Sequence, residues 1–127
     1  MTTTQATIQT ESLTLKTAWV AERARARAAR SEGNTTAEWR HLERAHILSQ
    51  PLVWPHLATH AAMFSAAWRR RDLRELAGQG VRLLLAVPGS VSGRYPVGNT
   101  GGSDVSAFRP MPIPDDLRPL LTVEDPR

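Results

Sequence analysis

The chain has no cysteine, and its 127 residues include a single lysine, Lys16. Without cysteine it can form no disulfide bond, no thiolate nucleophile and no metal site built from sulfur. No run of apolar residues approaches the length of about 18 that a membrane-spanning helix needs. Residues 1–10 are rich in Thr and Gln and have neither the basic start nor the apolar centre of a signal peptide. We therefore expect a cytoplasmic protein that does not enter a membrane.

The charge is basic but dispersed. Lys and Arg number 16 against 12 Asp and Glu, which gives a formal net charge of +4. A nucleic-acid-binding protein usually gathers its basic residues on one face within a recognisable motif. The arginines between Arg23 and Arg30 instead alternate with alanines, without an interleaved aromatic residue, which is typical of a solvated helix face. Nucleic acid is therefore not an expected partner.

Hydrophobic spacing predicts four helices. Two of them have clear start signals, because a hydroxyl or carboxylate stands three residues before a glutamate at Thr35–Glu38 and at Asp72–Glu75. The third helix is expected to begin at Pro55, since the first helical turn tolerates proline. The fourth is expected to end at Pro88–Gly89. The predicted helices cover about residues 11–31, 35–50, 55–71 and 72–87.

The third helix carries two neighbouring stripes of residues, both with helical spacing. The more apolar stripe is expected to form the core, and the stripe one position earlier is expected to lie on its flank. The core stripe consists of Leu57, Ala61, Phe64 and Trp68, and the flanking stripe of His56, His60, Met63 and Ala67.

The composition changes after residue 87, where seven of the nine prolines and five of the eight glycines lie. Residues 98–104 are rich in glycine but lack the Lys-Ser/Thr ending of a phosphate-binding loop, so we expect a turn that lets the chain reverse over the helices. Residues 109–114 alternate with proline and are expected to be extended. The apolar residues expected to pack across the helices are Val97, Val105, Phe108, Met111 and Ile113.

Together these patterns predict an all-α protein of two antiparallel helical hairpins with a Pro/Gly-rich C-terminal tail packed over them. The hairpins loosely resemble tetratricopeptide repeats, because Gly33, Leu42 and Ala45 stand near positions that such a repeat favours. The expected organisation is a disordered N-terminus over 1–10, a four-helix domain over 11–87, an extended wrap over 88–121 and a disordered C-terminus over 122–127.

A candidate metal site lies in the second and third predicted helices. His56 and His60 are four residues apart, so on a helix both imidazoles can reach one ion. Glu43 and His46 have the Glu-x-x-His spacing of helical metal sites. The candidate ligands are therefore Glu43, His46, His56 and His60, with Gln50 as a donor that could support them.

A second pair repeats the Glu-x-x-His spacing at Glu38 and His41. His41 and His46 are five residues apart and diverge by about 140° around a helix, so they cannot easily share an ion. Glu38 and His41 would be exposed or form a second, weaker site.

Two other roles for these histidines stay open. They could be buried core residues satisfied by hydrogen bonds, because a His-x-x-x-His pair occurs often by chance. They could also act as a general acid or base, but the sequence indicates no nucleophile and no polar pocket. An enzyme is therefore the least favoured class, and no catalytic residue is assigned.

Two stretches resemble a known family: His41-Leu-Glu-Arg-Ala-His-Ile-Leu-Ser-Gln50, and Gly98-Asn-Thr-Gly-Gly-Ser-Asp-Val-Ser-Ala-Phe108 with the following Pro-Met-Pro-Ile-Pro run. They are similar to a family of small bacterial proteins, domain of unknown function 3703. The similarity covers about residues 34–120, with both motifs in the expected order. It implies no assigned activity and only a preference for metal handling.

The sequence thus predicts a small helical protein that binds a divalent transition metal and acts in metal handling or resistance. Nitrogen and oxygen ligands without sulfur favour Zn, Ni, Cu(II) or Fe(II) over mercury or Cu(I). The alternative is a helical module for protein–protein interaction without metal, which would use an exposed Trp or the tail to contact an unknown protein partner. The sequence does not indicate the oligomeric state.

Overall fold

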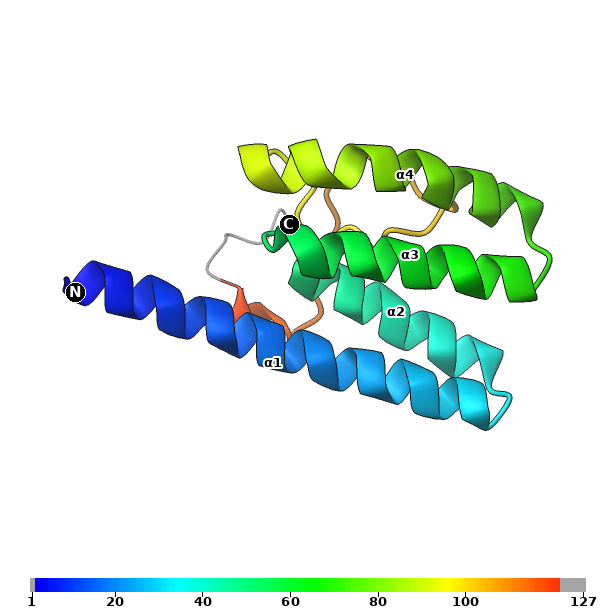
Figure 1. Cartoon of the computed structure of the whole chain (residues 1–127), viewed down its shortest axis with the longest axis horizontal. Helices are drawn as coiled ribbons and strands as arrows, with labels where there is room; N and C mark the ends of the chain where they lie inside the picture. Colours follow the sequence, from blue (N-terminus) through cyan, green and yellow to red (C-terminus); the bar gives the residue numbers. More distant parts are fainter. Residues whose placement is uncertain (1, 122–127) are drawn as a thin grey trace.

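The computed structural model describes residues 2–121, and these form the predicted all-α fold. Four helices, α1 (Thr3–Ser31), α2 (Thr35–Ser49), α3 (Val53–Arg69) and α4 (Leu73–Ser92), pack in sequence order as two antiparallel hairpins, and a short 3₁₀ helix, η1 (Arg118–Leu120), packs on α1. Figure 1 shows the helices side by side, with the tail returning from α4 across them towards α1. Among the described residues, none of the helices is both long and apolar enough to cross a membrane. The predicted disorder of residues 122–127 lies outside the described residues.

Helix α1 begins at Thr3, earlier than the expected start near Glu11, so residues 3–10 are helical. The Thr2 side chain accepts a hydrogen bond from the Gln5 amide, and the Gln5 side chain accepts one from the Thr2 amide. This capping box satisfies two amide groups that a helix start leaves free. It needs no apolar stripe, and hydrophobic spacing therefore did not reveal it.

The start of α2 also differs in its details from the prediction. Asn34, and not Thr35, is the N-cap, and its side chain accepts a hydrogen bond from the Ala37 amide. The Glu38 carboxylate, expected to complete a capping box, instead binds the Arg69 guanidinium at the end of α3. A long-range ion pair thus takes the place of the predicted local capping contact.

The prediction for the core face of α3 was wrong by one position. Met63 and Ala67, from the expected flank, are fully buried, whereas Trp68 from the expected core stripe is 68% exposed. Phe64 is only half-buried and Ala61 is exposed. Both stripes have the same helical period, so the choice between them depends on which one finds partners in the fold. His56 and His60 find theirs on α4.

Helix α4 continues through Pro88 to Ser92 and ends at Gly93, whose φ of 69° is the left-handed conformation common at helix ends. Proline breaks one helical hydrogen bond, to the carbonyl of Leu84 four residues earlier. Both residues lie on the exposed side of α4. The last turn of α4 is held by Ser90, whose hydroxyl donates to the carbonyl of Gln50, the C-cap of α2. The four-helix segment therefore extends beyond residue 87.

The tail packs over the helices as predicted. Ile113 and Leu117 join Leu15, Ile47 and Leu48 in one buried apolar cluster, and Val97 packs against it. A second cluster, further along the hairpins, is centred on Leu42 and Met63. Phe108, expected to pack across the helices with the rest of the tail, is exposed instead.

Candidate metal centre

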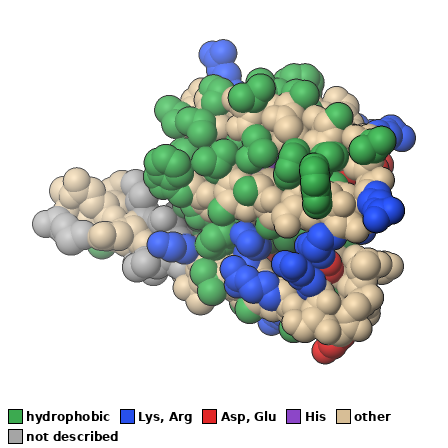
Figure 2. All heavy atoms as spheres, turned by 45° about the vertical axis from the view of Figure 1, so that its right-hand side comes forward, with side chains coloured by type: hydrophobic (Ala, Val, Ile, Leu, Met, Phe, Trp, Pro, Cys, Tyr) green, Lys and Arg blue, Asp and Glu red, His purple; other side chains and the backbone are tan. Residues whose placement is uncertain are grey.

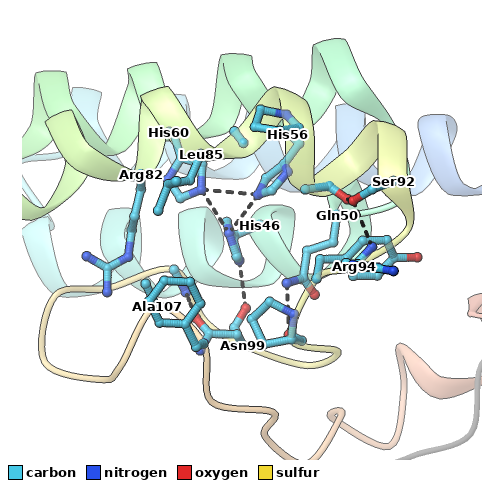
Figure 3. Close-up of a pocket in the computed structure, with 17 residues that line it drawn as sticks. His46, Gln50, His56, His60, Arg82, Leu85, Ser92, Arg94, Asn99 and Ala107 are labelled. Carbon is cyan, nitrogen blue, oxygen red and sulfur yellow. Dashed lines mark hydrogen bonds between the residues drawn. The ribbon is translucent and has the colours of Figure 1, made fainter.

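Three histidine rings meet between α2, α3 and α4. His46 comes from α2, and His56 and His60 come from successive turns of α3. Each pair of Nε2 atoms is 3.1 Å apart, and all three side chains are buried. Figure 3 shows the three rings pointing toward one another. Among the described residues, this His triad (His46, His56 and His60) is the one group whose potential ligand atoms lie close enough together to hold a metal ion.

The hydrogen-bond partners of Nδ1 in His46 and His60 determine which nitrogen of each ring carries the proton. His46 Nδ1 lies 2.6 Å from the Asn99 carbonyl, which can only accept, so Nδ1 carries the proton. His60 Nδ1 lies 2.6 Å from Gln79 Oε1. The Gln79 amide nitrogen donates to Glu75 and to the Gly101 carbonyl, which fixes the orientation of the amide. His60 therefore also carries its proton on Nδ1.

His56 reaches the same state through a hydroxyl. Its Nδ1 lies 2.7 Å from Ser90 Oγ, and the Ser90 hydroxyl donates its own proton to the Gln50 carbonyl. Ser90 must then accept from His56, which places the proton on Nδ1. In the neutral state all three Nε2 atoms therefore present lone pairs to one another. Such an arrangement is repulsive unless a cation or a proton lies among them.

The spacing of the His triad fits a transition metal. Three Nε2 atoms 3.1 Å apart are close enough together for all of them to reach one ion at the Zn–N bond length of about 2.0–2.1 Å. Histidines that bind metal usually donate their second N–H to a carbonyl, carboxylate or similar group, which orients the ring. All three rings of the triad have such a partner.

Burial keeps the His triad neutral. It lowers the pKa of His56 to about 3 and that of His60 to about 4, and it also takes the pKa of His46 well below 6.5. Burial is the largest cause of these shifts; repulsion among the rings contributes to the lowered pKa values of His46 and His56, and Arg82 contributes to those of His46 and His60. The lone pairs thus remain available to a metal ion well into the acidic range.

A pH dependence of stability follows for the metal-free protein. The unfolded histidines bind protons below about pH 6.5, while the folded triad does not until about pH 4, so the unfolded state holds more protons in between. The free energy of unfolding should fall with decreasing pH through this range, by about 1.4 kcal/mol per ring for each pH unit. Urea unfolding with a chelator present at pH 7.5, 6.5 and 5.5 measures it. Equal stability at the three pH values would mean that the rings are not buried as neutral groups.

The glycine-rich loop forms one wall of the site, a role that the sequence did not reveal. Asn99 is buried, and its side chain donates to the carbonyls of Ser106 and Arg109 and accepts from the Gly101 amide. These bonds hold the Asn99 carbonyl against His46. Gly101 has a φ of 83°, and a Cβ atom there would lie 2.6 Å from the His46 ring. The loop is thus a fitted part of the site as well as a turn.

Gly101→Ala should therefore displace the His46 ring. The substitution places a methyl group closer to the ring than van der Waals contact allows. It also forces alanine into a left-handed conformation, which costs about 1 kcal/mol by itself. We expect lower stability and weaker metal binding than in the wild type. Gly80→Ala is the control, because a Cβ atom there meets nothing within 4 Å. The metal affinity of Gly80→Ala should equal that of the wild type. Equal affinities in Gly80→Ala and Gly101→Ala would mean that the loop does not help to form the metal site.

The other candidate residues lie apart from the His triad. Glu43 is not grouped with the triad. Burial raises the pKa of Glu43, a hydrogen bond with Trp39 lowers it, and the acidic Asp104 and Glu75 raise it. His41 lies 2.7 Å from Glu22, and Glu38 pairs with Arg69. The structure thus brings together three of the four predicted ligands, without Glu43, and pairs His41 and Glu38 with residues of other helices.

A pocket of about 260 Å³ adjoins the triad, and all three rings line it. Its apolar walls include Leu85 and Phe108. Gln50 also lines the pocket. Its side-chain amide nitrogen donates to the Pro96 carbonyl, and its Oε1 is buried without a partner among the described residues. In Figure 3, Gln50 and Arg82 flank the triad on opposite sides. The pocket gives a small ligand or an ion access to the three rings.

Comparison with known proteins gave a match to a protein family. The family model described as "Protein of unknown function (DUF3703)" matches residues 13–121, most of the chain. No curated protein and no solved structure matches. The function must therefore be argued from the site itself.

Proposed function

This chain belongs to the DUF3703 family, whose function is unassigned, and we propose that it binds one divalent transition-metal ion through Nε2 of His46, His56 and His60. The observation that carries the proposal is the convergence of three lone pairs 3.1 Å apart, each on a ring whose Nδ1 proton is held elsewhere. Hydrogen bonds between the rings would need a proton on one Nε2, and the Nδ1 partners Asn99, Ser90 and Gln79 leave none there.

The ligand chemistry narrows the choice of ion. Three neutral imidazoles and no sulfur suit Zn, Ni, Cu(II) or Fe(II), and they suit mercury and Cu(I) poorly. Structural zinc sites are closed by four protein ligands, whereas three ligands and an open position are typical of sites where the ion exchanges or reacts. The pocket beside the triad supports the open type. We propose a role in metal handling or resistance, in which an ion enters and leaves through this pocket.

Cobalt(II) provides the test of the ligand set. Added to untagged, metal-free protein, Co(II) should give intense visible d–d bands that saturate at one ion per chain, and these should be absent from His46→Ala. Circular dichroism of the metal-free variant establishes that it is folded. A spectrum indistinguishable from that of cobalt in buffer would contradict the proposed ligand set.

A helical interaction module is the second candidate function. It is supported by the outer face of α4, where apolar side chains are exposed. The two functions are compatible, because this outer face and the His triad lie on opposite sides of α4.

A further inference from the structure

Helix α4 has its polar and apolar sides reversed relative to an ordinary surface helix. Its buried residues are Glu75, Gln79, Ala86 and Ser90, three of them polar. Its exposed side carries large apolar residues, among them Leu84 and Val91, which are 79% and 71% exposed. Figure 2 shows hydrophobic side chains gathered over the upper part of the molecule, where α4 lies. A helix at the surface normally has the opposite arrangement.

The inward side explains the reversal. Gln79 and Ser90 hold His60 and His56, and Glu75 holds Gln79 and the amide of Ser103. The inner face of α4 is therefore occupied by the groups that orient the metal centre. The apolar residues on its outer face contribute nothing to the core of a single chain, and a large exposed apolar patch usually marks an interaction site.

The spacing of this outer face is that of a helix-pairing seam. Successive intervals of four, three, four and three residues form the heptad pattern by which two helices pack against each other. We call these residues the α4 seam; it is about 21 Å long at 1.5 Å per residue. Its members, all exposed, are Ala77, Val81, Leu84, Pro88 and Val91.

We propose that the α4 seam pairs with the same seam of a second copy of this chain, antiparallel about a two-fold axis. Between Val81 and Val91 the one charged residue is Arg82, which the tail holds through the carbonyls of Gly102 and Val105. Two seams can therefore meet without opposing charges. A membrane surface is the poorer occupant, because a membrane-bound helix carries basic residues along its polar face, and here that face is buried against the triad.

The relative direction of the two paired α4 helices follows from Arg74, which lies beside the start of the seam. A parallel pair would bring the two Arg74 side chains together. An antiparallel pair places each near the carboxyl end of the partner's helix, where positive charge is favourable. The last turn of α4 has no basic residue of its own, and Arg94, which follows the C-cap Gly93, lines the pocket beside the triad.

The size of the seam sets the strength of the pair. A strip about 21 Å long, the length of the seam, and about 10 Å wide covers about 210 Å² on each copy. Stable interfaces bury about 800 Å² per partner. Exposed Leu85 and Phe108, which line the pocket, add to the apolar surface. We therefore expect a dimer that dissociates on dilution.

Sedimentation velocity over a wide concentration range tests the pairing. The wild type should pass from monomer at micromolar to dimer at near-millimolar concentration, and Leu84→Glu should remain monomeric throughout. Val20→Glu places the same change at an exposed apolar site on α1 and should dimerise like the wild type. Cobalt binding by Leu84→Glu should be unchanged, which separates this result from the fate of the metal proposal.

Two outcomes would overturn the pairing. One is a wild-type chain that stays monomeric over the whole concentration range. If that monomeric chain also floats with phosphatidylcholine vesicles, lipid is the occupant of the seam. The other is a dimer that Leu84→Glu leaves intact, which would place the contact elsewhere.

Discussion

His60→Ala should abolish the rise in melting temperature that a divalent metal gives the wild-type protein. An ion that binds only the folded state stabilises it by about 2.7 kcal/mol when its concentration is 100 times the dissociation constant. Removing one of three ligands leaves two imidazoles and an unfilled space, and the Nδ1 partner Gln79 loses its donor. Melting curves with and without Zn, for wild type and variant, measure the effect.

His41→Ala is the matched control for this experiment. His41 lies on α2, one turn and a half before His46, and it binds Glu22 on α1. Its loss should lower the basal melting temperature slightly and leave the metal-dependent rise intact. Equal loss of that rise in His41→Ala and His60→Ala would mean that the ion binds elsewhere.

Met63→Ala should lower the free energy of unfolding by about 2–5 kcal/mol, as large-to-small changes at fully buried sites do. Met63 lies in the cluster with Leu42, Ala26 and Ala66 and has no exposed surface. Trp68→Ala removes a larger side chain but from an exposed position, so it should cost distinctly less. Urea unfolding of the two variants measures the difference. A greater loss from Trp68→Ala would restore the other stripe of α3 to the core.

Local chemistry made much of the fold predictable. Helical spacing identified the four helices, and Asp72 caps α4 as its place before Glu75 predicted. The spacing of His56 and His60 was sufficient to place both rings on one side of α3. Each of these inferences depends on residues within one or two turns of one another, where geometry is fixed by the helix itself.

The remaining features depend on contacts between distant segments. Two stripes on α3 fit the same period, and the buried one was decided by Gln79 and Ser90 on α4, which supply hydrogen-bond partners for His60 and His56. The same polar demand reversed α4, whose polar residues Gln79 and Ser90 are buried and whose apolar residues Leu84 and Val91 are exposed. A rule that places apolar residues inside fails where a buried polar site needs support.

The ligand set shows the same limit. Glu43 stands three residues before His46, within reach of a shared ion by spacing alone, but its carboxylate lies in the field of Asp104 and Glu75 instead. The wall that holds His46 comes from Asn99, more than 50 residues away in the chain. The glycines of that loop indicated a turn, and only the close approach of Gly101 to the ring reveals their second role.

Calorimetric titration of the untagged, metal-free protein with Zn tests the central claim most directly. The His triad predicts one ion per chain, bound more tightly than micromolar at pH 7, because the three rings are neutral and already oriented. Nickel, Cu(II) and Fe(II) provide parallel titrations with the same expected stoichiometry. Binding no tighter than micromolar for all four ions would contradict a metal centre at His46, His56 and His60.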